Sequence, residues 1–367
     1  MSKKKIISVV GARPNFMKVA PIHRALSVLD EFEHVICHTG QHYDANMSDT
    51  FFEDLNMPQP KFFLGVGSGS HAEQTAKTMI EFEKVVLEYR PDLVIVVGDV
   101  NSTIACTLTA AKCGIKTAHV EAGLRSFDKS MPEELNRMAT DAIADYYFVT
   151  EQSGIDNLQK AGISDENIFF VGNTMIDSLN YALPYARKSN ILSELKLTPK
   201  QYALITIHRP SNVDNASNLE SMLEVLEYLS KYRTVVFPVH PRTKNNIEKY
   251  NLSRFLKNPK IQFIDPLGYV NFLALMLNAD FVLTDSGGIQ EETTAIGVPC
   301  LTARTTTERP STITLGTNIL VPPTKQGIIN AIDNIMNNPR KEGTVPPLWD
   351  GKAAERIANV LKFKVFK

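Results

Sequence analysis

Residues 281–302, "FVLTDSGGIQEETTAIGVPCLT", contain a strand, a turn, a helix and a second strand in succession. An apolar run ends in a Ser-Gly-Gly turn, and the helix-forming segment "IQEETTAIG" separates it from the apolar run "VPCLT". Strands that are apolar on both faces and that alternate with helices form parallel sheets covered on both sides. The segment therefore predicts a doubly wound α/β domain.

The same alternation continues on both sides of this segment. The first half contains six further β-rich runs: Ile6–Val10, His34–Thr39, Leu93–Asp99, Thr117–Gly123, Tyr146–Thr150 and Ile168–Asn173. The second half contains five: Tyr202–His208, Thr234–His240, Ile261–Asp265, Phe281–Ser286 and Val298–Thr302. The stretch 184–199 is polar and strand-free. We therefore predict two Rossmann-like domains, residues 1–180 and 181–348, and a helix in 349–367 that packs back on the first domain.

The whole-chain composition excludes several classes of protein. At 367 residues the chain exceeds the single-core size of about 100–200 residues, so two domains are expected. The net charge of −1 supplies no basic field for nucleic acid or anionic lipid. No apolar run reaches the roughly 18 residues that span a bilayer, and the N-terminal "IISVV" is typical of a strand and not of a signal peptide. Four cysteines without ligand spacing indicate neither a disulfide framework nor a zinc site. We predict a cytoplasmic protein.

Polar segments follow seven of the predicted strands. They are "GARPNFMK", "TGQHYD", "GDVNST", "VEAGLRS", "HRPSN", "HPRT" and "DSGGIQEE". Ligands of doubly wound sheets bind beyond the carboxyl ends of the strands. With two such domains, we expect the active site in the cleft between them.

The "DSGG" turn predicts an anion site, because its glycines allow close approach and the following helix presents N–H groups and a favourable dipole. A carboxylate one turn further on can accept both hydroxyls of a ribose. Phosphate on the turn and ribose on the acid together describe a nucleotide. The alternative is a glycine-rich turn followed by a solvated acidic helix start.

The first strand is followed by "GARPNFMK" and not by G-x-G-x-x-G, which disfavours a nicotinamide enzyme, and the chain has no Walker A sequence. Arg13 and Lys18 suit a diphosphate, and otherwise they are two surface cations.

Acidic residues cluster as Asp99, Glu121, Glu133 and Glu134, and His208 comes from the second domain. Carboxylates facing one cleft suit general acid–base work. The alternatives are an N-cap for Asp99 and favourable first-turn positions for the two adjacent glutamates. His119, His208 and His240 lack metal-ligand spacing, so we predict neither a metal nor another cofactor.

Nine segments, taken in order, resemble the signature segments of the non-hydrolysing UDP-N-acetylglucosamine 2-epimerases. They are "GARPNFMKVAP", "TGQHYD", "GDVNST", "VEAGLRS", "PEELNR", "GNTMID", "HRPSN", "DSGGIQEE" and "TTTERP". The resemblance implies a glycosyltransferase-B-like fold with an interdomain active-site cleft. It also implies a cytoplasmic homodimer that interconverts UDP-N-acetylglucosamine and UDP-N-acetylmannosamine through a glycal, without a redox cofactor.

The resemblance also implies the site residues. The catalytic group would be Asp99, Glu121, Glu133 and His208, with Lys18 and Arg137 as electrostatic support. UDP would be held by Arg13, Phe272, Ser286, Gly287, Gly288, Glu292 and Arg309, with Phe272 at the uracil and Glu292 at the ribose.

One segment departs from many bacterial members, which read "HRREN" where this chain has "HRPSN". The replaced Arg-Glu pair belongs in those enzymes to a second, activating substrate site, whose remaining members here would be Gln41, His42 and His240. The departure resembles epimerases of more decorated sugars, such as a diacetamido-glucuronic acid. A UDP-sugar glycosyltransferase, a hydrolysing epimerase and a catalytically dead UDP-sugar sensor are also compatible with the sequence.

Overall fold

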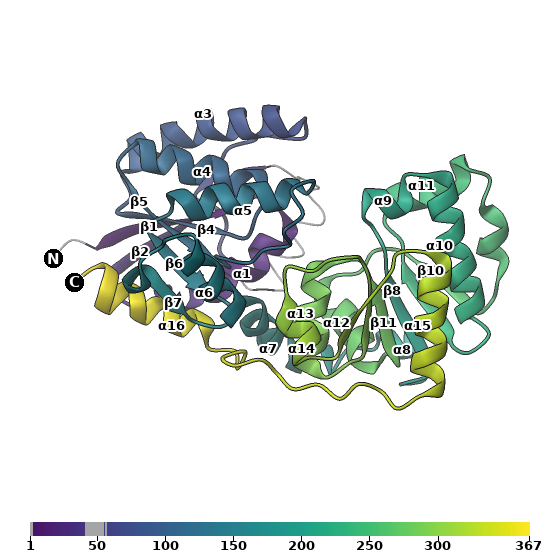
Figure 1. Ribbon diagram of the computed structural model, residues 1–367. Coiled ribbons are helices and arrows are strands. Elements are labelled where there is room, and N and C mark those ends of the chain that lie inside the picture. Colours follow the sequence, from purple (N-terminus) through teal and green to yellow (C-terminus); the bar gives the residue numbers. More distant parts are fainter. Residues whose placement is uncertain (1–2, 41–54, 56) are drawn as a thin grey trace. The chain divides into compact units, whose positions relative to one another are not determined.

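The computed structural model describes residues 3–40, 55 and 57–367, and the chain divides into two compact units. The first unit comprises residues 1–181 and 347–367, and the second comprises residues 182–346. Each unit contains one parallel sheet, of seven and six strands respectively, with helices packed on it (Figure 1). The prediction of two doubly wound α/β domains is confirmed.

The sheet of the first unit has the order β3-β2-β1-β4-β5-β6-β7. Its central strands β1 and β4 bury apolar side chains on both faces: Ile6, Ile7, Val9 and Val10 of β1 are buried, as are all of residues 93–97 in β4. The strands are β1 (Lys4–Val10), β2 (Phe32–His38), β3 (Phe62–Phe63), β4 (Leu93–Val97), β5 (Lys116–Val120), β6 (Tyr146–Val149) and β7 (Ile168–Phe170).

Helices connect these strands and cover the sheet. Helix α3 begins at a capping box, in which the Ser70 hydroxyl accepts the Glu73 N–H and the Glu73 carboxylate accepts the Ser70 N–H. The helices of this unit are α1 (Arg13–Ser27), α3 (His71–Tyr89), α4 (Asn101–Lys112), α5 (Pro132–Ile143), α6 (Gln152–Lys160), η1 (Asp165–Asn167), α7 (Thr174–Ala186), α16 (Ala353–Val360) and η3 (Leu361–Val365).

The sheet of the second unit has the order β10-β9-β8-β11-β12-β13. Its strands are β8 (Tyr202–Thr206), β9 (Thr234–Pro238), β10 (Ile261–Ile264), β11 (Phe281–Thr284), β12 (Cys300–Ala303) and β13 (Asn318–Val321). Its helices are α8 (Ile191–Glu194), α9 (Pro210–Val213), α10 (Ala216–Leu229), α11 (Pro241–Lys249), η2 (Ser253–Lys257), α12 (Tyr269–Asn278), α13 (Gly287–Ile296), α14 (Pro310–Thr314) and α15 (Lys325–Asn337). One apolar core runs between β8, β9 and helices α10 and α15.

The end of the chain is fixed to the first unit by buried polar contacts. The indole Nε1 of Trp349 donates to the Thr150 carbonyl at 2.9 Å, and the Asp177 carboxylate accepts the N–H groups of Ala353 and Ala354 at 3.1 and 2.7 Å. Asp177 therefore caps α16 from a position 176 residues earlier in the chain. A Cβ at Gly172 would lie 2.0 Å from the Leu348 carbonyl oxygen, so this approach requires glycine.

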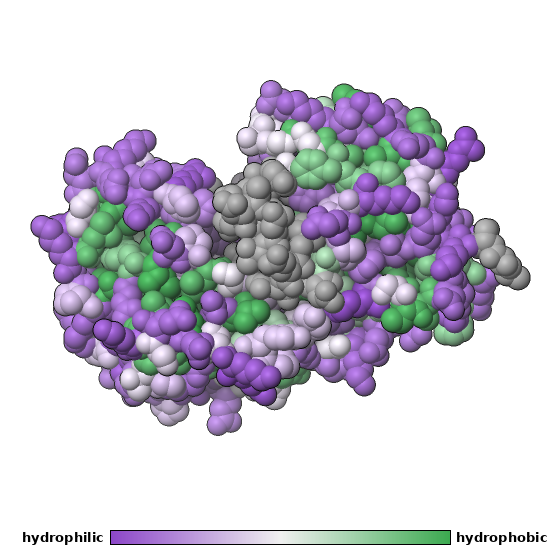
Figure 2. Space-filling view, turned by 180° about the vertical axis from the view of Figure 1, so that it is seen from behind, coloured by the Kyte–Doolittle hydropathy of each residue, from purple (hydrophilic) through white to green (hydrophobic). Residues whose placement is uncertain are grey.

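The sequence missed two strands of the sheets, β3 and β13, and it started β12 two residues early, at Val298. Strand β3 has only two residues, which pair with Cys37 and His38 of β2. Among the described residues, no helix combines the length and apolar character needed to cross a bilayer. Figure 2 shows one face of the molecule, on which hydrophobic residues form scattered patches among hydrophilic ones.

The Asp177 cap predicts a pH-dependent contribution to stability. Burial raises the pKa of Asp177 to about 6, against the lowering effect of the two N–H groups. Because the folded pKa lies above the unfolded one, the contribution is complete below about pH 4 and is lost as pH rises through about 6. We expect Asp177→Asn to abolish a fall of up to about 3 kcal/mol in unfolding free energy over this range. Urea unfolding of both proteins at pH 4.5 and 7 measures it, and an equal change with pH in both would contradict the assignment.

Candidate active site

Three of the predicted strand-end segments meet at Gly11, directly after β1. A Cβ at Gly11 would lie 2.2 Å from the Ser102 hydroxyl of "GDVNST" and 2.9 Å from the Thr39 hydroxyl of "TGQHYD". The Asn15 side chain closes the loop, because its Oδ1 accepts the N–H groups of Gly11 and Ala12 and its Nδ2 donates to the Val97 carbonyl. This role of Asn15 was not predicted from the sequence. The side chain of Arg13 lies outside the described residues.

Four of the six predicted catalytic residues form one chain of ion pairs in the first unit. Lys18 Nζ contacts Glu121 Oε2, and Arg137 Nη2 lies 3.4 Å from Glu121 Oε1 and 2.7 Å from Asp99 Oδ2. Lys18, Glu121 and Arg137 are buried, whereas 20% of the Asp99 side chain is exposed. Charges alternate along this chain, and its solvent-facing end is the Asp99 carboxylate.

The backbone aims Glu121 at the two cations. Glu121 follows the last residue of β5 and has φ of 71°, a left-handed conformation that is uncommon for a residue with a side chain. Its N–H donates to the Phe148 carbonyl at 3.0 Å. Gly98 makes room opposite, because a Cβ there would lie 3.0 Å from Lys18 Nζ.

A second buried cluster supports the loop that carries Asp99. His119 Nδ1 lies 2.7 Å from Asp141 Oδ1, and its Nε2 lies 2.8 Å from the Gly98 carbonyl. Burial alone would raise the pKa of Asp141, but His119 and Arg125, 2.6 Å from Oδ2, hold it below its ordinary value. His119 belongs to "HVEAGLRS", a segment at the end of a predicted strand. Nothing in that segment indicates its partner Asp141, which lies 22 residues further on.

Asp99 does not cap the following helix, since the N-cap of α4 is Val100. Asn136 instead fixes the Asp99 backbone by donating to its carbonyl at 2.9 Å. The adjacent glutamates of α5 differ in position. Glu134 is buried and accepts the Ser126 N–H at 2.8 Å, whereas Glu133 is exposed within the first unit.

In the second unit, the predicted His208 contacts a residue that the sequence did not single out. Its Nδ1 lies 2.9 Å from Oδ1 of Asp285, a fully buried carboxylate directly after β11. The N–H groups of His208 and Arg209 and the amide of Asn212 also donate to this carboxylate. The three residues of "HRPSN" that match the family pattern therefore all donate to Asp285.

The glycine turn lies at the start of α13, as predicted. Ser286 is the N-cap, and its own side chain makes no capping hydrogen bond. Arg309 lies beside the turn and pairs with Glu308 and, through Nε at 2.9 Å, with Glu291. A Cβ at Gly287 would lie 2.8 Å from Arg309 Nη1, so glycine permits the guanidinium to approach. Gly288 follows in the same turn.

The predicted ribose and uracil residues lie on neighbouring helices of the same unit. Glu292 of α13 is buried, and its Oε1 accepts the Tyr269 hydroxyl of α12 at 2.7 Å. Phe272 lies one turn beyond Tyr269 and is 9% exposed. Gln290, which the sequence did not single out, accepts the Thr307 hydroxyl at 2.7 Å and so ties "TTTERP" to α13.

The second-site residues are only partly described. Gln41 and His42 lie outside the described residues, as do the side chains of Pro210 and Ser211. His240 is exposed and caps α11, because its Nδ1 accepts the Arg242 N–H at 3.2 Å. Within residues 3–40, 55 and 57–367, no group of three His, Cys, Asp or Glu side chains could hold a metal ion.

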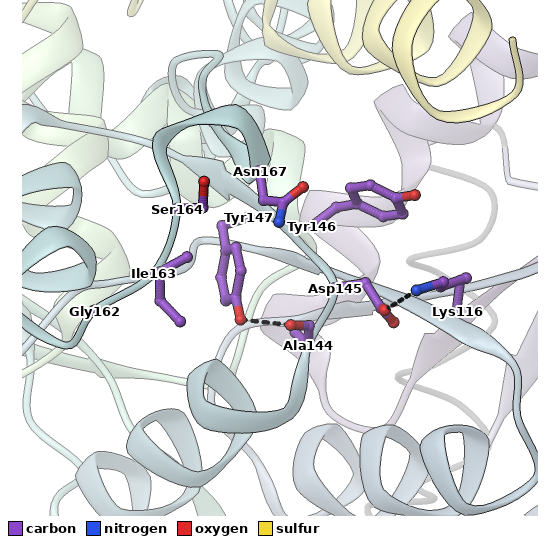
Figure 3. A pocket seen from close by; sticks show the side chains of 9 residues that line it. All are labelled: Lys116, Ala144, Asp145, Tyr146, Tyr147, Gly162, Ile163, Ser164 and Asn167. Carbon is purple, nitrogen blue, oxygen red and sulfur yellow. Dashed lines mark hydrogen bonds and ion pairs between the residues drawn. The ribbon is translucent and has the colours of Figure 1, made fainter.

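A cavity of about 300 Å³ lies elsewhere in the first unit (Figure 3). It involves the amino ends of β5 and β6, and none of the predicted site residues lines it. Its charged groups Lys116 and Asp145 pair with each other, and the Tyr147 hydroxyl donates to the Ala144 carbonyl. We therefore place the candidate site at the carboxyl ends of the strands and not in this cavity.

The comparisons with known proteins point to one family over most of the chain. The profile of the UDP-N-acetylglucosamine 2-epimerase family matches residues 24–362. The chain is 44% identical to the UDP-N-acetylglucosamine 2-epimerase of Methanocaldococcus jannaschii, over 98% of this chain and 99% of the relative. It is 38% identical to a UDP-2,3-diacetamido-2,3-dideoxy-D-glucuronate 2-epimerase of Pseudomonas aeruginosa, over 97% and 99%.

The fold matches as well. The crystal structure of the Methanocaldococcus jannaschii enzyme in complex with UDP-N-acetylglucosamine and UDP superposes with a TM-score of 0.90. That match has 43% identity and covers 98% of this chain and 99% of that one. The prediction of a glycosyltransferase-B-like α/β fold is confirmed.

The close approach at Gly98 predicts a difference between two glycine substitutions. Gly98 and Gly114 both have positive φ, 68° and 73°, but a Cβ at Gly114 would meet nothing within 4 Å. We expect Gly114→Ala to cost about 1 kcal/mol of unfolding free energy through backbone strain alone. Gly98→Ala should cost about 1–3 kcal/mol more, because it also displaces the buried Lys18 ammonium. Urea unfolding measures both, and equal costs would contradict the packing role.

Proposed function

The chain belongs to the UDP-N-acetylglucosamine 2-epimerase family, and we propose that it interconverts UDP-N-acetylglucosamine and UDP-N-acetylmannosamine. The observation that carries the proposal is the buried chain of ion pairs from Lys18 through Glu121 and Arg137 to Asp99. These four side chains come from four separate segments, each of which matches a signature segment of the family. Their mutual contact makes one acid–base group out of residues up to 119 positions apart, since Arg137 and Lys18 both pair with Glu121.

The proposed reaction has two steps. The hydrogen on carbon-2 of the sugar is not acidic, so its removal needs a simultaneous departure at carbon-1. The carbon-2–hydrogen bond breaks and its electron pair forms the double bond of a glycal. The carbon-1–oxygen bond breaks and its pair leaves with UDP, while the proton passes to a protein base. UDP then adds back to carbon-1 as a proton is delivered to the other face of carbon-2.

In this proposal the first unit supplies the acid–base groups. Asp99 is suited to proton transfer because it lies at the solvent-facing end of the ion-pair chain and contacts only one of its cations, Arg137. Glu121 lies between Lys18 and Arg137, which favours its ionised form, so it stabilises the positive charge that develops on the sugar ring. Glu133 is exposed in the first turn of α5 and serves as the further proton carrier.

The second unit, in this proposal, holds the nucleotide. The start of α13 at Ser286, Gly287 and Gly288, where the N-cap side chain makes no capping hydrogen bond, binds the diphosphate together with Arg309 and Arg13. Glu292 binds the ribose hydroxyls, and Phe272 contacts the uracil. Support comes from Tyr269, whose hydroxyl donates to Glu292 Oε1 at 2.7 Å and so orients this buried carboxylate. His208 exchanges a proton with the substrate.

Proton NMR in deuterated water tests the function directly. UDP-N-acetylglucosamine incubated with the enzyme, and with no acceptor, should give the manno epimer with deuterium at carbon-2. Free UDP released at the rate of turnover would identify a hydrolysing enzyme, and turnover only with an added acceptor would identify a glycosyltransferase. Tight UDP binding without any turnover would identify a sensor.

A decorated UDP-sugar is the second candidate substrate. The observation that favours it is the "HRPSN" segment, together with the 38% identity to the diacetamido-glucuronate epimerase. The same NMR assay with a UDP-diacetamido-glucuronic acid ranks the two substrates by kcat/KM.

We also propose a cytoplasmic homodimer. All four cysteines are free thiols and three of them are buried, as suits a reducing compartment. Helices α3 and α5 expose apolar side chains that a second copy would cover: Ile80, Leu87, Leu135 and Met138. Analytical ultracentrifugation at several protein concentrations measures the oligomeric state.

The substitution Asp99→Asn should reduce turnover by about 10²-fold or more and leave UDP affinity unchanged, because it removes a proton carrier. Arg137 keeps Glu121 as a partner, so the variant should fold. Asp145 lies at the amino ends of the strands of the same sheet and provides the matched control: Asp145→Asn should keep full turnover. Near-normal turnover of Asp99→Asn would remove Asp99 from the acid–base group.

The substitution Glu292→Gln should weaken UDP binding by about tenfold, roughly 1.4 kcal/mol, because an amide accepts hydroxyl groups less strongly than a carboxylate. Tyr269→Phe keeps the charge and removes the hydroxyl from Oε1, so it should change affinity less. Calorimetry with UDP measures both. Unchanged affinity in Glu292→Gln would leave this residue with a role in helix packing only.

The altered "HRPSN" loop predicts the absence of substrate activation. Proline lacks an N–H and serine lacks a charge, so the pair cannot replace Arg-Glu in an activating site. Activation needs differential binding to two states, and losing the charged pair reduces that difference. Conversion of the manno epimer should therefore start without added gluco substrate, and initial rates should be hyperbolic. A lag that a trace of the gluco sugar abolishes would contradict this, and would implicate Gln41, His42 or His240.

A further inference from the structure

The carboxylate of Asp285 is surrounded by hydrogen-bond donors from residues 208–212. It is completely buried at the end of β11. It accepts the backbone N–H groups of His208 and Arg209, at 3.1 and 2.9 Å, and the side-chain amide of Asn212 at 2.8 Å. A further contact, at 2.9 Å, is to Nδ1 of the His208 imidazole.

We propose that Asp285 is a positioning residue for His208: it holds the imidazole with hydrogen on Nδ1 and leaves Nε2 to exchange a proton with the substrate. The inference rests on the role given to His208 in the proposed function. An ionised carboxylate can only accept hydrogen bonds, so the nitrogen that faces it must carry the hydrogen. The His208 side chain is 57% exposed, so the imidazole can reach a ligand although its partner is buried.

The surroundings of Asp285 favour the ionised form that this role requires. Burial alone would raise the pKa of Asp285, but the His208 contact and the N–H donors of Arg209 and Asn212 bring it below its ordinary value. The Arg209 and Asn212 donors bind Oδ2, whereas the imidazole contacts Oδ1, so the carboxylate is held by the loop while its other oxygen faces the ring. The ring orientation is thereby set before any ligand binds.

The imidazole takes up one proton and releases one proton in each catalytic cycle. Nε2 takes one proton as the substrate's bond to that hydrogen breaks: the electron pair of the broken bond stays with the substrate, and the Nε2 lone pair forms the new N–H bond. Asp285 stabilises the imidazolium that results. The same proton leaves Nε2 later in the cycle, and the imidazole returns to its neutral form with hydrogen on Nδ1. Asp285 remains a carboxylate throughout, so it assists through His208 and never touches the reacting atoms.

A purely structural role for Asp285 is the competing explanation, because the same contacts anchor residues 208–212. The two explanations differ in what they predict for the imidazole. An anchor could be weakened with a proportional loss of stability and of UDP affinity. A positioning carboxylate affects kcat and the protonation of Nδ1 at unchanged affinity.

The test compares two buried aspartates at opposite ends of β11. Asp285→Asn should lower kcat by about 10²-fold or more, with KM and the UDP dissociation constant nearly unchanged. Asp280, which precedes the strand and pairs with Arg233 and Arg340, is the control. Asp280→Asn should lose stability, measured by urea unfolding, and keep kcat. Parallel losses of kcat, UDP affinity and stability in Asp285→Asn would overturn the proposal.

Nitrogen NMR of ¹⁵N-histidine-labelled enzyme locates the imidazole hydrogen in the wild-type enzyme itself. This result does not depend on whether the Asp285→Asn variant folds. The His208 signals are identified by their loss in His208→Ala. In the wild-type enzyme near neutral pH, hydrogen should lie on Nδ1, and in Asp285→Asn it should move to Nε2. Hydrogen on Nε2 alone in the wild-type enzyme would overturn the proposal.

A double substitution completes the test. Once His208 is alanine, adding Asp285→Asn should lower kcat by less than about twofold, because a positioning residue acts only through its partner. Multiplicative losses would overturn the proposal. A fully active His208→Ala enzyme would instead exclude His208 from the proposed function. The NMR measurement would still show whether Nδ1 carries the hydrogen that faces Asp285.

Discussion

The Glu121 carboxylate, enclosed by the cations of Lys18 and Arg137, is the contact on which the first unit's strand ends depend. Two charges removed from water cost several kcal/mol each, and only close partners offset this cost. Removing one partner from such a pair typically destabilises a protein by about 3–5 kcal/mol. The three segments that supply these side chains are therefore constrained together, and Asp99 is added to them through Arg137. Replacing Lys18, Glu121 or Arg137 would therefore leave a buried charge with fewer partners, whereas the Asp99 side chain is 20% exposed and its replacement leaves Arg137 paired with Glu121.

Much of the fold could be predicted because it depends on local pattern. Apolar runs such as Leu93–Val97 are buried on both faces and alternate with amphipathic helices, and both properties are visible in the sequence. Strand β3 could not be predicted, since two residues carry no periodicity and their pairing depends on β2. Strand β13 begins with a buried Asn318 whose amide is satisfied by Gln290 and Thr312, a compensation that only the tertiary structure reveals.

The candidate site likewise contains residues that could be predicted from the sequence and residues that could not. Lys18, Asp99 and Glu121 could be singled out because they belong to polar segments that follow predicted strands, whereas Arg137, in the middle of α5, was reached only through the family resemblance. The residues that hold them in place could not be singled out. Asn15, Asp141 and Asp285 are ordinary polar residues in sequence, and each gains its meaning from a partner that folding brings close. His119 and Asp141 are 22 positions apart, and His208 and Asp285 are 77. Similarly, nothing in "PEELNR" distinguishes exposed Glu133 from buried Glu134, whose carboxylate holds the Ser126 loop.

The return of residues 347–367 to the first unit has a consequence for synthesis of the chain. Domains generally fold as units in the order in which they leave the ribosome, the N-terminal one first. Here the first unit lacks Trp349 and the capped helix α16 until residues 347–367 have been made. The second unit, whose residues are contiguous from 182 to 346, is complete earlier. The order of completion is therefore inverted: the first unit, although most of its residues come earlier in the chain, waits for residues 347–367, which supply the indole that contacts the Thr150 carbonyl and the helix that Asp177 caps.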